Sequence, residues 1–399
     1  MADNNENKVL NVPHLRFPEF TGEWKKSTIG SLSTKVGSGV TPRGGETVYK
    51  SEGHSFVRSQ NVGWGHLQLD DIAFIDKETH LRQKNTELQL DDVLLNITGA
   101  SIGRSALVNK QIAGGNVNQH VCIIRTKDNL VPAFLCNFLL SNHGQKQIDS
   151  FQAGGNRQGL NFEQIRSIKI TIPSTKEQTK IATLLHLIDE RIATQNKIIE
   201  DLKKLKSAIV DKLYSSTNGK TYSFCQLFEV VNEKNKKLAY KNVLSASQEL
   251  GMIERSNINI DIKFEQESIS GYKIVRKGDY VVHLRSFQGG FAFSDTTGIC
   301  SPAYTILRPN DLVVYGYLSH FFTSKPFIKS LKLVTYGIRD GRSINVDEWL
   351  DMPILLPSAQ EQMRILTIVN AIDAKLHNEA KVQFCLSSQK SYLLNTMFI

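Results

Sequence analysis

A long stretch of helical periodicity covers residues 174–215, which contain no glycine and no proline. Its hydrophobic residues recur every three or four positions, the heptad pattern of a helix that supercoils with a partner helix. At 1.5 Å per residue such a helix is roughly 60 Å long, and it needs a partner to bury a continuous stripe. The pattern predicts a coiled-coil helix; the alternative is an amphipathic helix packed on a globular core. The stripe comprises Ile181, Leu185, Ile188, Ile192, Ile199, Leu202, Ile209 and Leu213, with Gln195 and Lys206 at its two polar positions.

The same pattern returns 184 positions later, over residues 358–399. Pro173 recurs as Pro357, the pair Glu177-Gln178 as Glu361-Gln362, and Asp189 as Asp373. A constant period of this length makes the chain two copies of one unit. The second stripe comprises Ile365, Val369, Ile372, Leu376, Leu386, Leu393 and Met397, with the polar residues Glu379, Gln383 and Lys390 in the same register.

Each helix has a defined start. A proline stops the preceding segment, and Ser174 or Ser358 is the candidate N-cap, with a glutamate three residues later as in a capping box. Each helix follows its own globular block along the chain, so parallel pairing would force the second block to reach back along the whole coil. We therefore expect antiparallel pairing about a pseudo-two-fold axis, with the polar stripe positions setting the register.

The segments before each helix are richer in glycine, aromatic and β-branched residues. Short strand-like runs such as 55–58, 92–97 and 120–125 are separated by Gly and Asn turns, which indicates twisted β-rich domains with a few helices. The predicted class is α/β (α+β), with two β-rich globular domains and a long antiparallel two-helix coiled coil. The expected boundaries are 1–173 for the first globular domain, 174–216 for the first spacer helix, 217–357 for the second globular domain and 358–399 for the second spacer helix.

The two globular blocks share several short similar segments, but the stretches between these segments differ. Residues 278–283 resemble 91–96, residues 303–308 resemble 120–125, and residues 339–345 resemble 155–161. The loop at 39–45, however, has no counterpart in the second block. A shared framework with divergent loops is typical of two binding modules that recognise different targets.

Composition and charge favour an acidic partner. The 399 residues carry a formal net charge of +9 and have a sequence pI near 9.1, which suits nucleic acid. Five cysteines are scattered without C-x-x-C spacing, as expected of reduced thiols, and the polar start has no apolar core of a secretory signal. No run of 18 apolar residues predicts a membrane span. We expect a cytoplasmic protein.

Basic and amide side chains gather in the glycine-flanked loops of both blocks. Arginine can pair with a guanine edge, and Asn or Gln with adenine, through two hydrogen bonds in the major groove. Any one of these residues alone is better explained as a turn residue or a surface hydrogen bond, so the recognition hypothesis rests on the set. The candidates are Arg43, Arg58, Gln60, Asn61, Arg104, Asn118, Gln119, His120 and Arg157 in block one, and His283, Arg285, Gln288, Arg339 and Arg342 in block two.

Motifs for catalysis within the chain are missing. Gly39 to Gly45 lacks the Lys-Ser/Thr of a phosphate-binding loop, and there is no N-P-P-[FY], HExxH or G-x-S-x-G. Asp and His residues form no metal-ligand spacing. We predict no catalytic residues, no metal site and no cofactor in this chain.

The repeated helix starts and paired blocks resemble the specificity subunit of type I restriction–modification enzymes. The loop Gly39-x-Thr41-Pro42, the run from Asp92 to Arg104 and the run from His283 to Gly290 share this resemblance, which extends from about residue 11 to 399. It implies that each globular block is a target recognition domain for one half of a bipartite DNA site, and it adds Thr41 to the DNA-binding candidates. Block two lacks the Gly-x-Thr-Pro loop, so contacts at that loop do not extend across the repeat.

The resemblance also implies partners. The helices would space the half-sites and dock two modification subunits, which bring S-adenosylmethionine and methylate adenine. Two restriction subunits would supply ATP- and magnesium-dependent translocation and cleavage. Two other functions stay open at this point: a stand-alone nucleic-acid enzyme with a diverged site, and a two-armed protein-binding scaffold without DNA contact.

Overall fold

The computed structural model describes residues 11–42, 44, 48–152, 159–247, 250–257, 266–283, 290–336 and 343–399. The chain divides into two compact units, Met1–Gln195 with Val382–Ile399, and Asn196–Lys381. Each unit therefore contains one globular block together with a part of each long helix. The boundaries of the compact units lie inside the helices, whereas the sequence-based domain boundaries lie at their ends.

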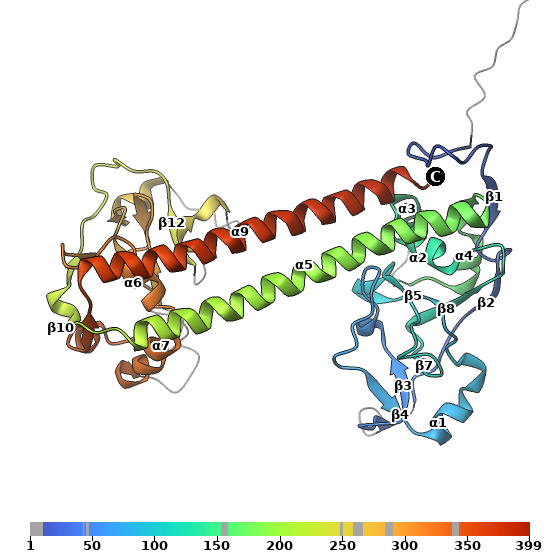
Figure 1. Ribbon diagram of the computed structural model, residues 1–399, viewed down its shortest axis with the longest axis horizontal. Helices are drawn as coiled ribbons and strands as arrows, with labels where there is room; N and C mark the ends of the chain where they lie inside the picture. The colour runs from blue at the N-terminus through green and yellow to red at the C-terminus, as the bar shows by residue number, and fades with distance from the viewer. Residues whose placement is uncertain are drawn as a thin grey trace, which may run out of the picture. The chain divides into compact units, whose positions relative to one another are not determined.

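A four-stranded antiparallel sheet forms the centre of the first unit (Figure 1). Its order is β2 (Ser33–Ser38), β8 (Val121–Thr126), β5 (Val93–Asn96) and β6 (Ser105–Leu107). Because successive residues of a strand face opposite sides, Val93 and Leu95 enter one hydrophobic core and Leu94 enters another. The sheet is therefore buried on both faces, which explains why β5 is a continuous apolar run.

The second unit repeats this sheet. Its order is β11 (Phe228–Val231), β18 (Thr305–Pro309), β15 (Tyr280–Val282) and β16 (Phe291–Phe293), again antiparallel throughout. Tyr280 and Val282 enter one core while Val281 enters another, as in β5. The repeat predicted from the helices thus includes the topology of the globular blocks.

A buried ion pair marks the same place in both sheets. Asp92 binds Arg125 through two hydrogen bonds of 2.7 Å, and Asp279 binds Arg308 through two of 2.9 Å. Both carboxylates are almost fully buried and also accept a backbone N–H. Charge-assisted bonds of this geometry are among the stronger ones in proteins, so the pair fixes the start of β5 or β15 against its neighbouring strand.

The remaining elements differ more. Besides its central sheet, the first unit contains a three-stranded sheet of order β4-β3-β7, whereas the second unit contains the two-stranded pairs β12-β13, β14-β17 and β19-β20. The first unit also contains β1 (Lys25–Thr28), β3 (His54–Val57), β4 (Ala73–Ile75), α1 (Lys77–Arg82), β7 (Asn116–Val117), α2 (Pro132–Leu140), α3 (Asn142–Ser150), α4 (Phe162–Ser167) and β9 (Lys169–Ile172). The second unit contains β10 (Lys220–Ser223), β12 (Leu244–Ser247), β13 (Gly251–Glu254), β14 (Lys273–Val275), β17 (Gly298–Cys300), α6 (Tyr317–Phe321), α7 (Lys325–Ser330), β19 (Thr335–Tyr336), β20 (Ser343–Ile344), α8 (Val346–Leu350) and β21 (Pro353–Leu356).

The two long helices are α5 (Thr175–Ser215) and α9 (Ala359–Thr396). Ser174 and Ser358 cap them, each accepting the N–H of the glutamate three residues later at 3.3 Å. The reciprocal bond of a capping box is not among the hydrogen bonds of the described residues. The carboxylate of Glu177 binds Arg16 instead, and that of Glu361 binds Arg364.

The repeated glutamine after each glutamate joins the helix to its globular block. Gln178 is fully buried, accepts the N–H of Val131 at 2.8 Å, and donates to the carbonyls of Asn129 and Pro173. Gln362 makes the same three bonds, to the N–H of Val314 and the carbonyls of Leu312 and Pro357. A buried amide with matched partners on three backbone groups explains why the glutamine occurs at the same place in both copies.

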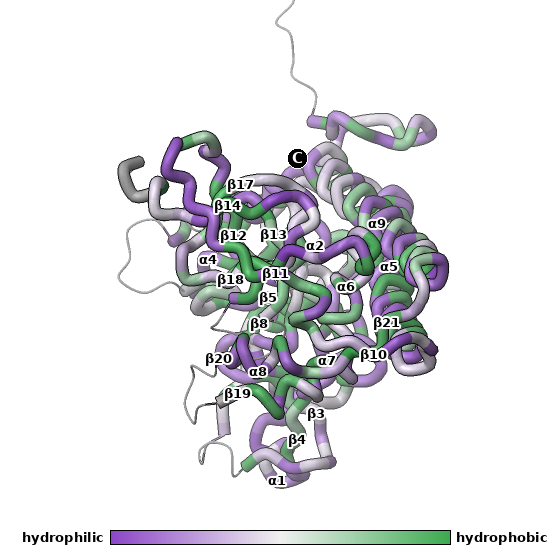
Figure 2. Tube along the Cα trace, turned by 90° about the vertical axis from the view of Figure 1, so that its left-hand side faces the viewer, coloured by the Kyte–Doolittle hydropathy of each residue, from purple (hydrophilic) through white to green (hydrophobic). Residues whose placement is uncertain are grey.

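Within each unit, segments of the two helices pack against each other in opposite directions. The first unit joins the start of α5 to the end of α9, and the second joins the end of α5 to the start of α9 (Figure 1). Hydrophobic and hydrophilic residues alternate along both helices (Figure 2), and the residues of both predicted stripes are buried or half-buried.

Two ion pairs across the helices are repeat copies of each other. Lys390 binds Asp189 at 2.5 Å in the first unit, and Lys206 binds Asp373 at 2.5 Å in the second. Adding 184 to Lys206 and Asp189 gives Lys390 and Asp373. Both lysines are polar stripe positions, and these cross-helix pairs are consistent with a role in register.

No described helix is long and apolar enough to cross a membrane. All five cysteines are free, with Cys122, Cys136 and Cys300 buried. Burial raises the pKa of Cys122 to about 12 and that of Cys136 to about 11, so these thiols stay protonated at neutral pH.

Candidate nucleic-acid interface

Loops from four strands meet at one edge of the first sheet. Strands β2 and β5 end there, at Ser38 and Asn96, while β6 and β8 begin there, because neighbouring strands are antiparallel. We call this the loop edge and define it by residues 39–42, 97–104 and 118–120. It gathers five of the predicted DNA-binding residues that the structure describes: Thr41, Arg104, Asn118, Gln119 and His120.

Hydrogen bonds link the loops of this edge. The N–H of Thr41 donates to Oε1 of Gln119 at 3.1 Å, and Oγ1 of Thr98 lies 2.7 Å from Nδ1 of His120. Nε2 of Gln119 is 3.4 Å from Nε2 of His120. Gln119 is exposed and His120 half-buried, so the network holds an amide and an imidazole at the surface.

Arg104 supplies the positive charge of the loop edge. It precedes β6, its carbonyl accepts the N–H of Asn96 at 2.9 Å, and its side chain is half-buried. In the described part of the chain no carboxylate pairs with its guanidinium. An uncompensated guanidinium beside exposed amides suits a phosphate or a guanine edge.

Other predicted residues are engaged internally. Asn61 is fully buried: its Oδ1 accepts the N–H of Arg58 and its Nδ2 donates to Gln68 O and to Asp71 Oδ1, each at 2.9 Å. Arg58 and Gln60 both bind Asp71. Asn118, 7% exposed, accepts the N–H of His120 at 3.1 Å. The amide of Asn61 is therefore used within the protein, and Oδ1 of Asn118 is used to shape its loop.

The matching edge of the second unit starts at His283. Its N–H donates to Gly290 O at 2.8 Å, as Asn96 donates to Arg104, so the two residues occupy equivalent places. Within the described residues, Asn96 Oδ1 and His283 Nε2 are buried without a hydrogen-bond partner. Burial lowers the pKa of His283, which keeps its ring neutral at pH 7. Six predicted residues lie outside the described residues: Arg43, Arg157, Arg285, Gln288, Arg339 and Arg342.

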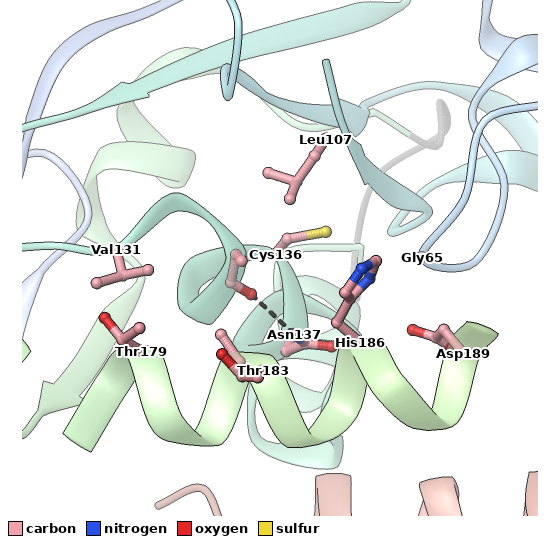
Figure 3. A pocket seen from close by; sticks show the side chains of 11 residues that line it. Gly65, Leu107, Val131, Cys136, Asn137, Thr179, Thr183, His186 and Asp189 are labelled. Carbon is pink, nitrogen blue, oxygen red and sulfur yellow. Dashed lines mark hydrogen bonds between the residues drawn. The ribbon is translucent and has the colours of Figure 1, made fainter. Parts of the chain in front are cut away.

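A cavity of about 330 Å³ lies between α2 and the start of α5 (Figure 3). Asn137 on its wall donates to Ala133 O at 2.8 Å, and the buried thiol of Cys136 is protonated. In the second unit, His320 is the equivalent of Asn137, because each lies six residues after the valine whose N–H binds the buried glutamine. Nε2 of His320 lies 3.9 Å from Oδ2 of Asp373. The cavity walls are mostly apolar and present no activated nucleophile.

Metal binding has no candidate site among the described residues, where no group of three or more His, Cys, Asp or Glu side chains converges. Sequence reasoning did not identify Thr98 as a residue of the loop edge. Thr98 lies in the run from Asp92 to Arg104, which shares the family resemblance but lies partly beyond the echo of 91–96 in the second block.

Comparison with known proteins matches the first part of the chain to a known domain. Residues 21–204 match the model of the type I restriction modification DNA specificity domain. The match covers the first globular block and most of α5, and the second block repeats the same sheet order. Residues 21–204 thus match the DNA specificity domain of type I restriction–modification systems, and the second unit repeats the order of its central sheet.

Individual relatives are similar over most of their length. The chain is 20% identical to the type I restriction enzyme EcoKI specificity subunit of Escherichia coli, over 88% of this chain and 82% of that protein. It is 21% identical to the putative type I restriction enzyme MjaX specificity subunit of Methanocaldococcus jannaschii, over 98% of this chain and 96% of that one.

Solved structures share the fold. The crystal structure of the type I restriction–modification S subunit from M. genitalium has a TM-score of 0.55 at 15% identity, covering 97% of this chain and 99% of that chain. A chain from a structure on complex assembly and conformational transition of the type I system has a TM-score of 0.59 at 14% identity, covering 93% and 96%. The predicted fold class is confirmed.

Proposed function

We propose that this chain is the non-catalytic DNA sequence-recognition subunit of a type I restriction–modification complex. Each globular block reads one half of a bipartite site, and the paired helices set the spacing between the half-sites. One observation carries the proposal: the two units share a sheet, a buried ion pair and a helix attachment, but differ in the loops and small sheets around them. Two readers of different sequences need such a division between frame and contact surface.

The loop edge is the proposed contact surface. In the first unit Arg104, Gln119, His120 and Thr41 face the DNA, while Asn61 and Asn118 support them. A net charge of +9 supplies phosphate attraction, and the base-edge contacts supply sequence choice. In the second unit the surface around His283 has the same role with different side chains.

The proposed partners carry the chemistry. Two modification subunits dock on the helices and bring S-adenosylmethionine, and two restriction subunits bring ATP and magnesium. The chain itself holds no cofactor in this scheme, and the complex acts in the cytoplasm. The missing motifs for nucleotide binding and methyl transfer support this assignment.

Methylation mapping tests the proposal. The chain is co-expressed with its cognate modification subunit, and methylated adenines are located genome-wide. We expect one bipartite motif, two short specific parts separated by a fixed number of unspecified bases. Methylation by the purified chain alone, or a contiguous motif, would contradict the proposal.

A further inference from the structure

The start of α5 is covered by the segment of residues 11–24 in the first unit. Arg16 binds Glu177 through two bonds, Nε to Oε1 at 2.7 Å and Nη2 to Oε2 at 2.9 Å. Trp24 donates its indole N–H to the same carboxylate at 3.3 Å. Glu177 is consequently only 1% exposed although it lies on the first turn of a long helix.

The covering segment holds itself in place around Arg16. The guanidinium also donates to the carbonyls of Gly22 at 2.7 Å and Thr21 at 3.2 Å, which closes the segment on itself. Phe17 packs against the core of the unit. Lys180, three residues after Glu177, lies 4.5 Å above the Phe17 ring and binds Glu19. The segment therefore presents an arginine, an aromatic ring and an acidic group to the helix start.

The second unit has the same frame without this cover. Lys25 opposes Ile172 in the first unit and Lys220 opposes Leu356 in the second, so Trp24 corresponds to Gly219. A Cβ on Gly219 would lie 2.1 Å from the carbonyl oxygen of Leu356, which excludes any side chain there. Only residues 216–219 connect α5 to β10, too few to form a counterpart of residues 11–24.

A cavity of about 590 Å³ remains at this place, which we call the Glu361 pocket. Its lining groups include the carboxylates of Asp311 and Glu361 and the ammonium group of Lys220, so an incoming cation is favoured only where it replaces the present partner of Glu361. It is lined by Asn218, Gly219, Lys220, Asp311, Leu312 and Glu361, among others, all within the second unit.

Arg364 forms an ion pair with the carboxylate of Glu361 in this structure. Its Nε lies 2.8 Å from Oε2 and its Nη2 2.7 Å from Oε1, but its side chain is 62% exposed. Exposed pairs three residues apart on a helix are weak and easily exchanged. The position that matches Arg364 in the first unit is Lys180, which turns away from Glu177 to hold the covering segment.

We propose that the Glu361 pocket binds a segment of a partner polypeptide that carries an arginine, then an aromatic residue and an acidic residue, as Arg16, Phe17 and Glu19 do. The incoming arginine takes the Glu361 carboxylate. Arg364 is released and binds the acidic residue, as Lys180 binds Glu19. This site is separate from the loop edge, and the proposal does not depend on DNA recognition.

A peptide of residues 13–22 of this chain is the probe, and calorimetry with the full-length chain is the measurement. The peptide with Arg16→Ala is the matched control ligand. We expect weak binding that falls about tenfold when the charge-assisted pair is lost, either with the control peptide or with the Glu361→Gln chain. The exposed Glu229 provides the matched control variant, Glu229→Gln, which should bind the peptide like the unmodified chain.

A second variant tests the cavity without changing charge. Asn218→Trp places an indole in the exposed wall of the Glu361 pocket and should abolish binding, while the melting temperature shows that the chain is folded. The proposal is overturned if the peptide does not bind at millimolar concentration. It is equally overturned if Glu361→Gln and Asn218→Trp leave the affinity unchanged, because the peptide would then bind elsewhere, for instance by replacing residues 11–24 in the first unit.

Discussion

Glu177 and Glu361 occupy the same position in the two units, yet their side chains are 2% and 37% exposed. The neighbouring Gln178 and Gln362, in contrast, bind equivalent backbone groups in the two units. One residue of the repeated pair therefore belongs to the frame that both units need. The other depends on what covers the helix start, which differs between the units. The comparison shows that a repeated motif can combine a structural residue with one whose environment has diverged.

Exchange of a whole block is the strongest way to test the division between frame and readers. Residues 219–357 are replaced by the corresponding block of another specificity subunit, which keeps the frame contacts at both ends. We expect one half of the methylated motif to change completely and the other half to remain. Methylation mapping with the modification subunit measures this. A change in both halves would show that the blocks do not read independently.

Loss of the buried ion pair should affect both units alike. Asp92→Ala and Asp279→Ala each leave a half-buried guanidinium and a backbone N–H without their acceptor, and each should lower the free energy of unfolding by about 3 kcal/mol. Urea denaturation measures the change, with the exposed Asp128→Ala as control. A small effect in only one unit would mean that the two sheets are not equivalent in energy.

Substitution of the two equivalent glutamates should change the free energy of unfolding by different amounts in the two units. Glu177→Gln breaks a bidentate bond to Arg16 in a buried setting and should cost about 2 kcal/mol of unfolding free energy. Glu361→Gln breaks only an exposed pair with Arg364 and should cost less than about 0.5 kcal/mol. The difference between the two denaturation midpoints is the measurement. Equal costs would refute the view that residues 11–24 give Glu177 its environment.

How far the sequence predicted this structure depends on the range of the interactions. The helix stripe and the N-cap serines follow from local spacing, and the echo of 91–96 in 278–283 marks equivalent strands. The partners of Arg16 and Asp71 could not be predicted, because 161 positions separate Arg16 from Glu177 and loop packing brings Asp71 to Asn61. For the same reason Asn61 and Asn118 were predicted as contact residues although the structure buries them.

The loop edge gives a smaller, local test of base contact. Arg104→Ala should weaken DNA binding of the assembled complex by about 1–3 kcal/mol and relax one base position if the guanidinium pairs with a base. If it binds phosphate, binding weakens equally on all sequences and the salt dependence falls. Lys110→Ala is the control, because this exposed lysine follows the opposite end of β6. An unchanged affinity for Arg104→Ala would remove the residue from the interface.

The smallest expected effect concerns acid stability. His320 in the second unit stands where the first unit has Asn137. Burial is the main cause that lowers the pKa of His320, and the positive charge of Lys206 adds to it, although Asp373 and Asn370 act in the opposite direction. A histidine with a lowered pKa in the folded state binds a proton more readily when unfolded, so it favours folding above pH 6.5 and opposes it as the pH falls below that value.

His320→Asn copies the first unit and should reduce the loss of stability between pH 7 and 5 by less than about 1 kcal/mol. Thermal melts across this pH range measure the change, and His377→Asn on the exposed face of α9 is the matched control. A variant that loses as much stability in acid as the unmodified chain would show that His320 is not responsible. Since Asn137 is uncharged at every pH, the difference between the two units at this position then lies in packing alone.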